Sequence, residues 1–535
     1  MRCNHLVLPT CLLFILPSFA IASWFEEAKV NVQALASGLM TPDSNEIEIA
    51  KAQPFPTQML GQSAANKDNV QGRYSYFIES IFHSQMLVFE TGLAHPQSLL
   101  LVHGLGQLGM QDWQDVVPEL AKHYHIIAID LPGFGLSGIP DGRYSPTHYA
   151  QVLDEVIARY AKDSVIVMGH SMGGAVSLRF AAMYPNKLER LILVDAAGIL
   201  EKTAFIKHIS GLSIDDMGQN EVSEPSVATE NTPSFALPEV LQTKWVQMKD
   251  LSGSLIEMGS LNVRATDFLQ HSDLSWDLLV APTPNLNAAL SLVEEDFSEE
   301  ISQLKVPTHV IWGAEDQVAP LRTAKVLRAR LPDVSVQIID HAGHVPMKSH
   351  TDAFLSGFEA ALSDSTDFHI TETHVAEKRW DQFNANTASI DHSAILVCDH
   401  ENNKSYSGHF KTVNINACSN IQLKNMTTDT LIITDSLVAI ENLMIHGSEL
   451  ALKATESVIT ITNANIHADK GLLLSGSRLD LAGVSINAQG FAIKAEVHSQ
   501  VLMSVSDIKS VHYQGWAQGG FELEGQTLSS VLLAR

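Results

Sequence analysis

The stretch Val165-Ile166-Val167-Met168-Gly169-His170-Ser171-Met172-Gly173, which continues as a helix-length segment to Tyr184, decides the fold of this 535-residue chain. A short apolar run followed by a helical segment is typical of a buried parallel strand and its crossover helix. Glycines on both sides of Ser171 allow a tight elbow between the two, which strains the serine backbone and projects its Oγ above the sheet. Gly and Ser are common residues, so the pentapeptide Gly169-His170-Ser171-Met172-Gly173 would mean little by itself. It indicates an elbow because it lies between an apolar strand and a helical segment.

The chain around this stretch alternates apolar runs with helix-length segments from Tyr74 to about Leu362. The runs predicted as strands are Ser98–His103, Ile126–Asp130, Val165–Gly169, Leu191–Asp195, His309–Trp312 and Val336–Ile339. The segments predicted as helices include Asp112–His123, Thr147–Ala161, Gly173–Tyr184 and Pro320–Leu331. This alternation predicts an α/β fold with a doubly wound, mostly parallel sheet, whose chemistry lies beyond the carboxyl ends of the strands.

Two later strands are followed by residues that could activate Ser171. A serine needs a histidine to take its proton and a carboxylate to fix the tautomer of that histidine. Asp316 follows one predicted strand and His344 follows the next, and the order Ser171, Asp316, His344 is that of α/β-hydrolases. Asp195, which also ends a strand, is the alternative acid, and His341 is the alternative histidine.

Five ordered motifs carry a resemblance to a known family. They are His103-Gly104-Leu105-Gly106, Asp130-Leu131-Pro132-Gly133-Phe134-Gly135-Leu136-Ser137, the serine elbow, Gly313-x-x-Asp316 and Gly343-His344-x-Pro346. Residues 74–365 resemble an α/β-hydrolase of the lipase and esterase type. The resemblance implies cleavage of carboxylic esters through an acyl-enzyme on Ser171, with an oxyanion hole formed by the backbone amides of Met172 and Leu105.

Several alternatives to ester cleavage stay open at this stage. Other reactions on the same fold include hydrolysis of carbon–carbon bonds or amides and perhydrolysis. An alternative that is not an enzyme is a surface-binding protein with a vestigial hydrolase domain. The histidines form no His-Glu-x-x-His pair, so no metal and no cofactor is expected, and His103, Asp130 and His170 are expected to be structural.

The alternation breaks between about residues 199 and 300, where a Ser- and Glu-rich stretch precedes a helical region rich in Leu and Met. An insertion of this length after a core strand predicts a helical cap over the site.

A different pattern begins beyond a linker at residues 366–389. Serines 436, 457, 477 and 499 each open a similar unit, and three apolar columns align. The columns are Val438, Ile459, Leu479 and Val501; Ile440, Ile461, Leu481 and Met503; and Ile445, Ile466, Ile486 and Ile508. A second strand in each unit is suggested by Leu450, Leu472 and Ile493.

Such a repeat predicts an all-β domain at residues 390–535 in which each unit is one coil. The pattern resembles right-handed parallel β-helices of the pectate-lyase-like type, and a small β-sandwich is the alternative. Because no acidic or basic cluster recurs in the columns, the domain is assigned no catalysis. Contact with a cell surface or a polymer is left open as its role.

Residues 1–22 contain Arg2, an apolar run from Leu6 to Leu16 and the small-residue end Ala20-Ile21-Ala22. This layout predicts a secretory signal peptide, followed by an N-terminal segment at 23–73, and an exported protein of the periplasm or the extracellular space. An uncleaved N-terminal anchor is the alternative; no stable membrane span is expected. Cys398 and Cys418 then remain as one candidate disulfide or two free thiols.

The formal net charge of −26 restricts the partners of the protein. A strongly acidic surface repels phosphate backbones, so nucleic acid is not expected to bind. The expected partner is a small-molecule or lipid ester as substrate.

Overall fold

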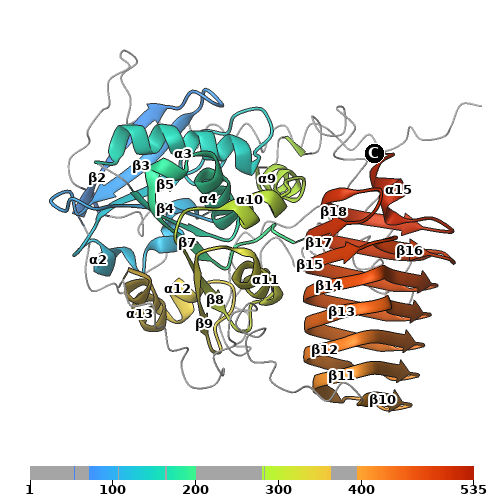
Figure 1. Ribbon diagram of the computed structural model, residues 1–535. Helices are drawn as coiled ribbons and strands as arrows, with labels where there is room; N and C mark the ends of the chain where they lie inside the picture. The colour runs from blue at the N-terminus through green and yellow to red at the C-terminus, as the bar shows by residue number, and fades with distance from the viewer. Residues whose placement is uncertain are drawn as a thin grey trace, which may run out of the picture. The chain divides into compact units, whose positions relative to one another are not determined.

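The computed structural model describes residues 53–54, 71–106, 108–162, 165–200, 280–281, 284–362 and 394–534. The predicted signal peptide, nearly all of the N-terminal segment, most of the cap and the linker lie outside these residues. We call residues 71–362 the α/β region and residues 394–534 the stacked-strand region (Figure 1).

The α/β region and the short strand β1 that precedes it form a nine-stranded sheet with the order β1-β2-β3-β5-β4-β6-β7-β8-β9. Its strands are β1 (Gln53–Pro54), β2 (Gln71–Ile78), β3 (Gln85–Thr91), β4 (Ser98–Val102), β5 (His125–Asp130), β6 (Val165–His170), β7 (Leu188–Val194), β8 (Thr308–Gly313) and β9 (Val334–Ile339). Strands β4 to β9 pair in parallel, and β2 and β3 pair antiparallel. The predicted doubly wound, mostly parallel sheet is confirmed.

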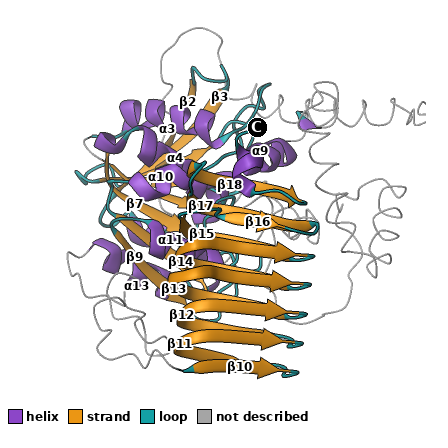
Figure 2. Ribbon diagram, turned by 45° about the vertical axis from the view of Figure 1, so that its right-hand side comes forward, coloured by secondary structure: helices purple, strands orange, loops and turns teal. Residues whose placement is uncertain are grey.

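Helices lie against this sheet (Figure 2). They are η1 (Gly109–Trp113), α2 (Val117–Leu120), α3 (Pro146–Tyr160), α4 (Met172–Met183), η2 (Pro185–Lys187), α9 (Pro284–Val293), α10 (Ser298–Gln303), α11 (Arg322–Arg330), α12 (Pro346–Ser349) and α13 (Thr351–Leu362). Leu100 and Val102 of β4 belong to one hydrophobic cluster, whereas Leu99 and Leu101 belong to another. Both faces of the sheet are therefore buried, which explains why its strands are continuously apolar.

The predicted helix Asp112–His123 is wrong in its extent. The structure has the short 3₁₀ helix η1 there, followed by the single-turn helix α2 with Pro118 in its first turn. Proline has no N–H to donate and its ring collides with the carbonyl group four residues earlier, so one helix cannot continue through this position.

The stacked-strand region is all-β apart from one short helix. Its elements are β10 (Ile395–Asp399), β11 (Ser405–Asn416), β12 (Ile421–Thr434), β13 (Leu437–Thr455), β14 (Val458–Ser475), β15 (Arg478–Ala488), β16 (Ile493–Ala495), β17 (Ser499–Lys509), β18 (Gln514–Leu523) and α15 (Leu528–Leu532). Strands β10 to β17 pair in parallel, and β18 alone runs antiparallel to its neighbour β17. Figures 1 and 2 show these strands stacked in sequence order.

The three predicted apolar columns are present in this stack. Val438, Ile459, Leu479 and Val501 are partners in register, and the other two columns align in the same way. The parallel pairing of strands one period apart excludes the antiparallel β-sandwich. The predicted alignment of Leu450 with Leu472 is wrong. Leu472 pairs with Leu452, and Leu450 pairs with Lys470. The register shifts between His446 and Ser448, an irregularity that spacing alone does not reveal.

The serines that mark the repeat form a hydrogen-bonded ladder. The Ser457 hydroxyl accepts the Ser436 amide N–H at 3.1 Å and donates to the Thr455 carbonyl at 2.7 Å. The Ser477 and Ser499 hydroxyls accept the amide N–H of Ser457 and Ser477 in the same manner. The columns bury apolar side chains, while this ladder pairs buried backbone amides at the turns.

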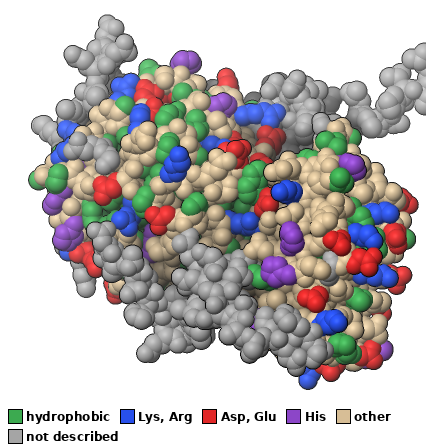
Figure 3. Space-filling model, viewed as in Figure 1, with side chains coloured by type: hydrophobic (Ala, Val, Ile, Leu, Met, Phe, Trp, Pro, Cys, Tyr) green, Lys and Arg blue, Asp and Glu red, His purple; other side chains and the backbone are tan. Residues whose placement is uncertain are grey.

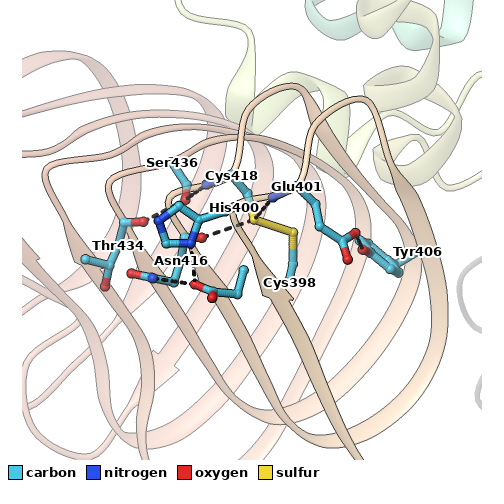
Figure 4. Close-up of a disulfide and its surroundings, with 9 residues drawn as sticks. Cys398, His400, Glu401, Tyr406, Asn416, Cys418, Thr434 and Ser436 are labelled. Carbon is cyan, nitrogen blue, oxygen red and sulfur yellow. Dashed lines mark hydrogen bonds and ion pairs between the residues drawn. A yellow bond between two sulfur atoms is a disulfide. The ribbon is translucent and has the colours of Figure 1, made fainter.

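Cys418 continues the ladder, since its amide N–H donates to the Ser436 hydroxyl at 2.9 Å (Figure 4). Cys418 and Cys398 form a disulfide with a Cα separation of 6.7 Å. The two cysteines were expected at equivalent places on adjacent strands. However, Cys398 lies opposite Ile415 in register, and Cys418 follows the end of β11.

Contacts between α11 and the stacked-strand region were not expected from the sequence. Three basic side chains of this helix pair with acids on three strands: Arg322 with Asp480 at 2.9 Å, Lys325 with Glu441 at 2.7 Å and Arg330 with Asp507 at 3.3 Å. The Arg330 side chain also donates to the Gly483 carbonyl at 2.6 Å.

Lys and Arg side chains are interspersed with Asp and Glu side chains on the face shown in Figure 3. Among the described residues, no helix is long and apolar enough to cross a membrane.

Candidate active site

The serine elbow lies between β6 and α4. Ser171 adopts φ 53° and ψ −120°, a left-handed backbone that is strained for a residue with a side chain. Its amide N–H donates to the Val194 carbonyl of β7 at 2.9 Å. A Cβ at Gly173 would lie 2.3 Å from the Val102 carbonyl oxygen, so only glycine allows α4 to start this close to β4.

Ser171, His344 and Asp316 are joined by hydrogen bonds, although they come from three separate loops. The Ser171 Oγ donates to His344 Nε2 at 2.9 Å. The other ring nitrogen of His344, Nδ1, donates to Asp316 Oδ2 at 2.8 Å. This tautomer leaves Nε2 free to take the serine proton, as a general base must.

The surroundings of Asp316 stabilise its charge. Burial opposes ionisation, but the neighbouring His344, together with hydrogen bonds from His344 and the Ala319 amide, lowers the pKa of Asp316 below its ordinary value. The Val318 and Ala319 amides both donate to Oδ1, at 2.7 and 3.0 Å. Asp316 is therefore ionised and held in place, as a residue that orients a histidine must be.

The predicted oxyanion donors lie on two sides of Ser171. Met172 is the first residue of α4, where a backbone N–H has no partner within the helix. Leu105 lies in the loop after β4, and the preceding Gly104 is so close that a Cβ there would be 2.8 Å from the Ser171 Cβ. The next amide in this loop, that of Gly106, already donates to Asn285 Oδ1 at 2.9 Å.

His103 and Asp130 hold loops, as the sequence predicts. His103 Nδ1 donates to the Gly104 carbonyl at 2.7 Å, and Nε2 accepts the Leu131 amide N–H at 3.0 Å. The Asp130 carboxylate accepts the amides of Met110 and Leu136 at 2.7 and 2.8 Å.

His170 has a contact that the sequence did not suggest. Its Nε2 donates to the backbone carbonyl of His344 at 2.7 Å, and the two rings lie 4.9 Å apart. Burial, followed by the nearby His344, lowers the pKa of His170 to about 4, so this ring is neutral at pH 7. The structural role expected for His170 therefore includes fixing the loop that carries His344.

Neither alternative residue takes the role in the triad that the sequence left open for it. Asp195 Oδ1 accepts the Gly313 amide N–H at 2.9 Å, and His344 is bonded to Asp316 instead. His341 points to solvent, with a side chain 84% exposed, and pairs with Glu315 at 3.0 Å.

One group of side chains at the site has the composition of a set of metal ligands. Among the described residues, Asp195, Asp316 and His344 are the one group of three or more acids, histidines or cysteines with ligand atoms within 4.8 Å of one another. Both nitrogens of His344 are already engaged, by Ser171 and Asp316. The group fits a proton-transfer site better than a cation site.

Comparison with known proteins defines the class. Residues 97–351 match the family model described as "alpha/beta hydrolase fold", and the hydrogen-bonded Ser171, His344 and Asp316 lie within this range. This part of the chain therefore has the α/β-hydrolase fold, as the resemblance implied.

Individual relatives are similar at modest identity. Lipase 1 of Psychrobacter immobilis is 27% identical over 310 residues, which cover 57% of this chain and 89% of the relative. Pimeloyl-[acyl-carrier protein] methyl ester esterase of Legionella pneumophila is 28% identical over 260 residues, which cover 48% of this chain and 92% of the relative. An uncharacterised protein of Mycobacterium bovis is 28% identical over 281 residues, which cover 50% and 76%.

Proposed function

We propose that this protein is an exported serine hydrolase that cleaves carboxylic esters. One observation carries the proposal: Ser171 in a strained elbow donates to His344, which in turn donates to Asp316. The names of two relatives, a lipase and a methyl ester esterase, support ester substrates.

The proposed reaction follows from this geometry. Ser171 Oγ attacks the ester carbonyl carbon while its proton passes to His344 Nε2, and the carbonyl oxygen becomes an oxyanion. The amides of Met172 and Leu105 donate to that oxyanion. The tetrahedral intermediate then collapses, the bond to the alkoxy oxygen breaks, and His344 protonates the leaving alcohol.

Water completes the cycle. His344 takes a proton from a water molecule whose oxygen attacks the acyl carbon, and the carboxylic acid leaves as the proton returns to Ser171. Asp316 stays ionised throughout and stabilises the imidazolium that forms twice in the cycle.

Export is proposed on two grounds. Residues 1–22 have the layout of a signal peptide, and the Cys398–Cys418 disulfide suits an oxidising compartment such as the periplasm or the extracellular space. We further propose that the stacked strands form a right-handed β-helix that contacts a cell surface or polymer, and that nucleic acid is not a partner.

The test is hydrolysis of esters of increasing acyl length, with matched amides, by the wild type and by Ser171→Ala. We expect ester turnover that falls by about 10⁶-fold in the variant. Ser302→Ala on α10, outside the site, is the matched control and should leave turnover unchanged. Amide cleavage without ester cleavage would show that the substrates are amides and not esters. Undiminished turnover by Ser171→Ala would overturn the mechanism.

A further inference from the structure

Asp195 is a buried acid that the proposed reaction does not use. It follows β7, is completely buried, and has a left-handed backbone with φ 43°. Its Oδ1 accepts the Gly313 amide N–H at 2.9 Å, whereas Oδ2 is buried and receives no hydrogen bond from the described residues.

The carboxyl of Asp316 lies close to that of Asp195. Ligand atoms of Asp195, Asp316 and His344 all lie within 4.8 Å of one another. Asp316 is needed as an anion, because it accepts from His344 and from two backbone amides. Two adjacent buried carboxylates repel each other strongly, so one of such a pair holds a proton.

Among the described residues, no lysine or arginine supplies a compensating charge to the pair. The titratable groups that face it are His344, from the loop after β9, and His170, from the elbow. Within the described part of the chain, neither carboxyl forms an ion pair with a lysine or an arginine. A single proton on Asp195 would turn two opposed acceptors into a donor and an acceptor.

We propose that Asp195 is a positioning residue that is protonated at neutral pH and donates a hydrogen bond to Asp316, which extends the chain Ser171–His344–Asp316 by one member. Burial and the neighbouring charge of Asp316 raise the pKa of Asp195 well above its ordinary value, which agrees with the geometry. The donated bond stabilises the Asp316 anion and limits how strongly it raises the basicity of His344. This inference rests on the proposed serine-hydrolase function.

Two substitutions of Asp195 distinguish a hydrogen-bond donor to Asp316 from a negative charge at this position. In Asp195→Asn, the amide oxygen can still accept from Gly313 and the amide nitrogen can still donate to Asp316. We expect kcat/KM within about threefold of the wild type and an unchanged acid limb of its pH profile. Asp195→Leu keeps the branching at Cγ but has no donor, so Asp316 becomes a stronger base and the acid limb should move upward by about one pH unit.

The direction of the shift decides the outcome. If Asp195 were ionised, both substitutions would remove a negative charge near His344 and move the acid limb to lower pH, which would overturn the proposal. An unmoved acid limb in a folded Asp195→Leu would also overturn it, because it would leave a purely structural role.

A second measurement does not depend on turnover. The infrared difference spectrum between the wild type and Asp195→Asn at pH 7 should contain the carbonyl stretch of a protonated carboxylic acid, and other buried acids such as Asp130 cancel in the difference. Its absence would overturn the proposal. If the wild type cleaves no ester but shows this band, the proposed function fails and the shared proton stands.

Discussion

The α/β region and the stacked-strand region both align parallel strands, but they use the alignment differently. In the first, chemically different side chains follow β6, β8 and β9 and meet at one edge of the sheet, where His344 joins Ser171 to Asp316. In the second, like residues stack: Val438, Ile459, Leu479 and Val501 are partners across successive strands. Reactivity comes from unlike neighbours at strand ends, whereas repetition along strands provides stability.

The largest expected effect tests the first half of this comparison. His344→Ala should lower kcat by about 10⁶-fold, and Asp316→Asn by about 10⁴-fold, because the members of the group act as a unit. Steady-state ester hydrolysis measures both. His341→Ala, three residues away and exposed, is the control and should retain activity; a loss there equal to that of His344→Ala would reassign the base.

The next effect tests whether the columns carry stability alone. Leu472→Ala removes a fully buried side chain between Leu452 and Ile493 and should destabilise the stacked-strand region by about 2–5 kcal/mol. Hydrogen exchange followed by mass spectrometry would localise the loss. Leu437→Ala, at a side chain 50% exposed, is the matched control. A fall in ester kcat of the folded Leu472→Ala protein would break the division between the regions.

A pH effect on the stability of the α/β region should come from a buried histidine. Burial lowers the pKa of His309 in β8 to about 4, so below about pH 6.5 the unfolded chain binds a proton that the native state excludes. Stability should therefore fall between pH 6.5 and 4, by up to about 3 kcal/mol from this residue. In His309→Gln this dependence should be weaker, as judged by hydrogen exchange of the two proteins at matched pH. Identical pH dependence would contradict the assignment.

The disulfide is expected to stabilise one end of the stack. It closes a 20-residue separation, which corresponds to about 3 kcal/mol in the chain-entropy account. The double substitution Cys398→Ala and Cys418→Ala should lower the protection of the β10 and β11 amides from hydrogen exchange. It should leave kcat unchanged. Alkylation of the unfolded, unreduced wild type is the independent check: two freely modified thiols would show that no bridge forms.

The smallest effect concerns the serine ladder. Ser457→Ala leaves the buried Ser436 amide without its partner and should cost about 1–3 kcal/mol. Hydrogen exchange of the Ser436 amide, at the turn between β12 and β13, reports this loss. Ser419→Ala, at an exposed serine, is the control. If both substitutions had the same negligible effect, the ladder would be a consequence of the apolar columns rather than a contributor to stability.

The sequence by itself determined what depends on local pattern. The apolar runs located strands β4 to β9, and the Gly169-His170-Ser171-Met172-Gly173 turn located the elbow, because such a turn needs glycine next to a strained serine. The spacing of serines and apolar residues likewise predicted the three columns of parallel partners. These features have a period or a fixed order along the chain.

Only the tertiary structure decided contacts between segments with no shared period. The sequence offered both Asp195 and Asp316 as strand-end acids, and the path of the loop after β9 brought His344 to Asp316 while Asp195 stayed bonded to Gly313. The shift of Leu450 out of its predicted column arises at a register irregularity, and the contacts of α11 combine ion pairs with buried apolar side chains such as Val326 and Ala482. Each of these depends on the distance between side chains in three dimensions, to which sequence separation is no guide.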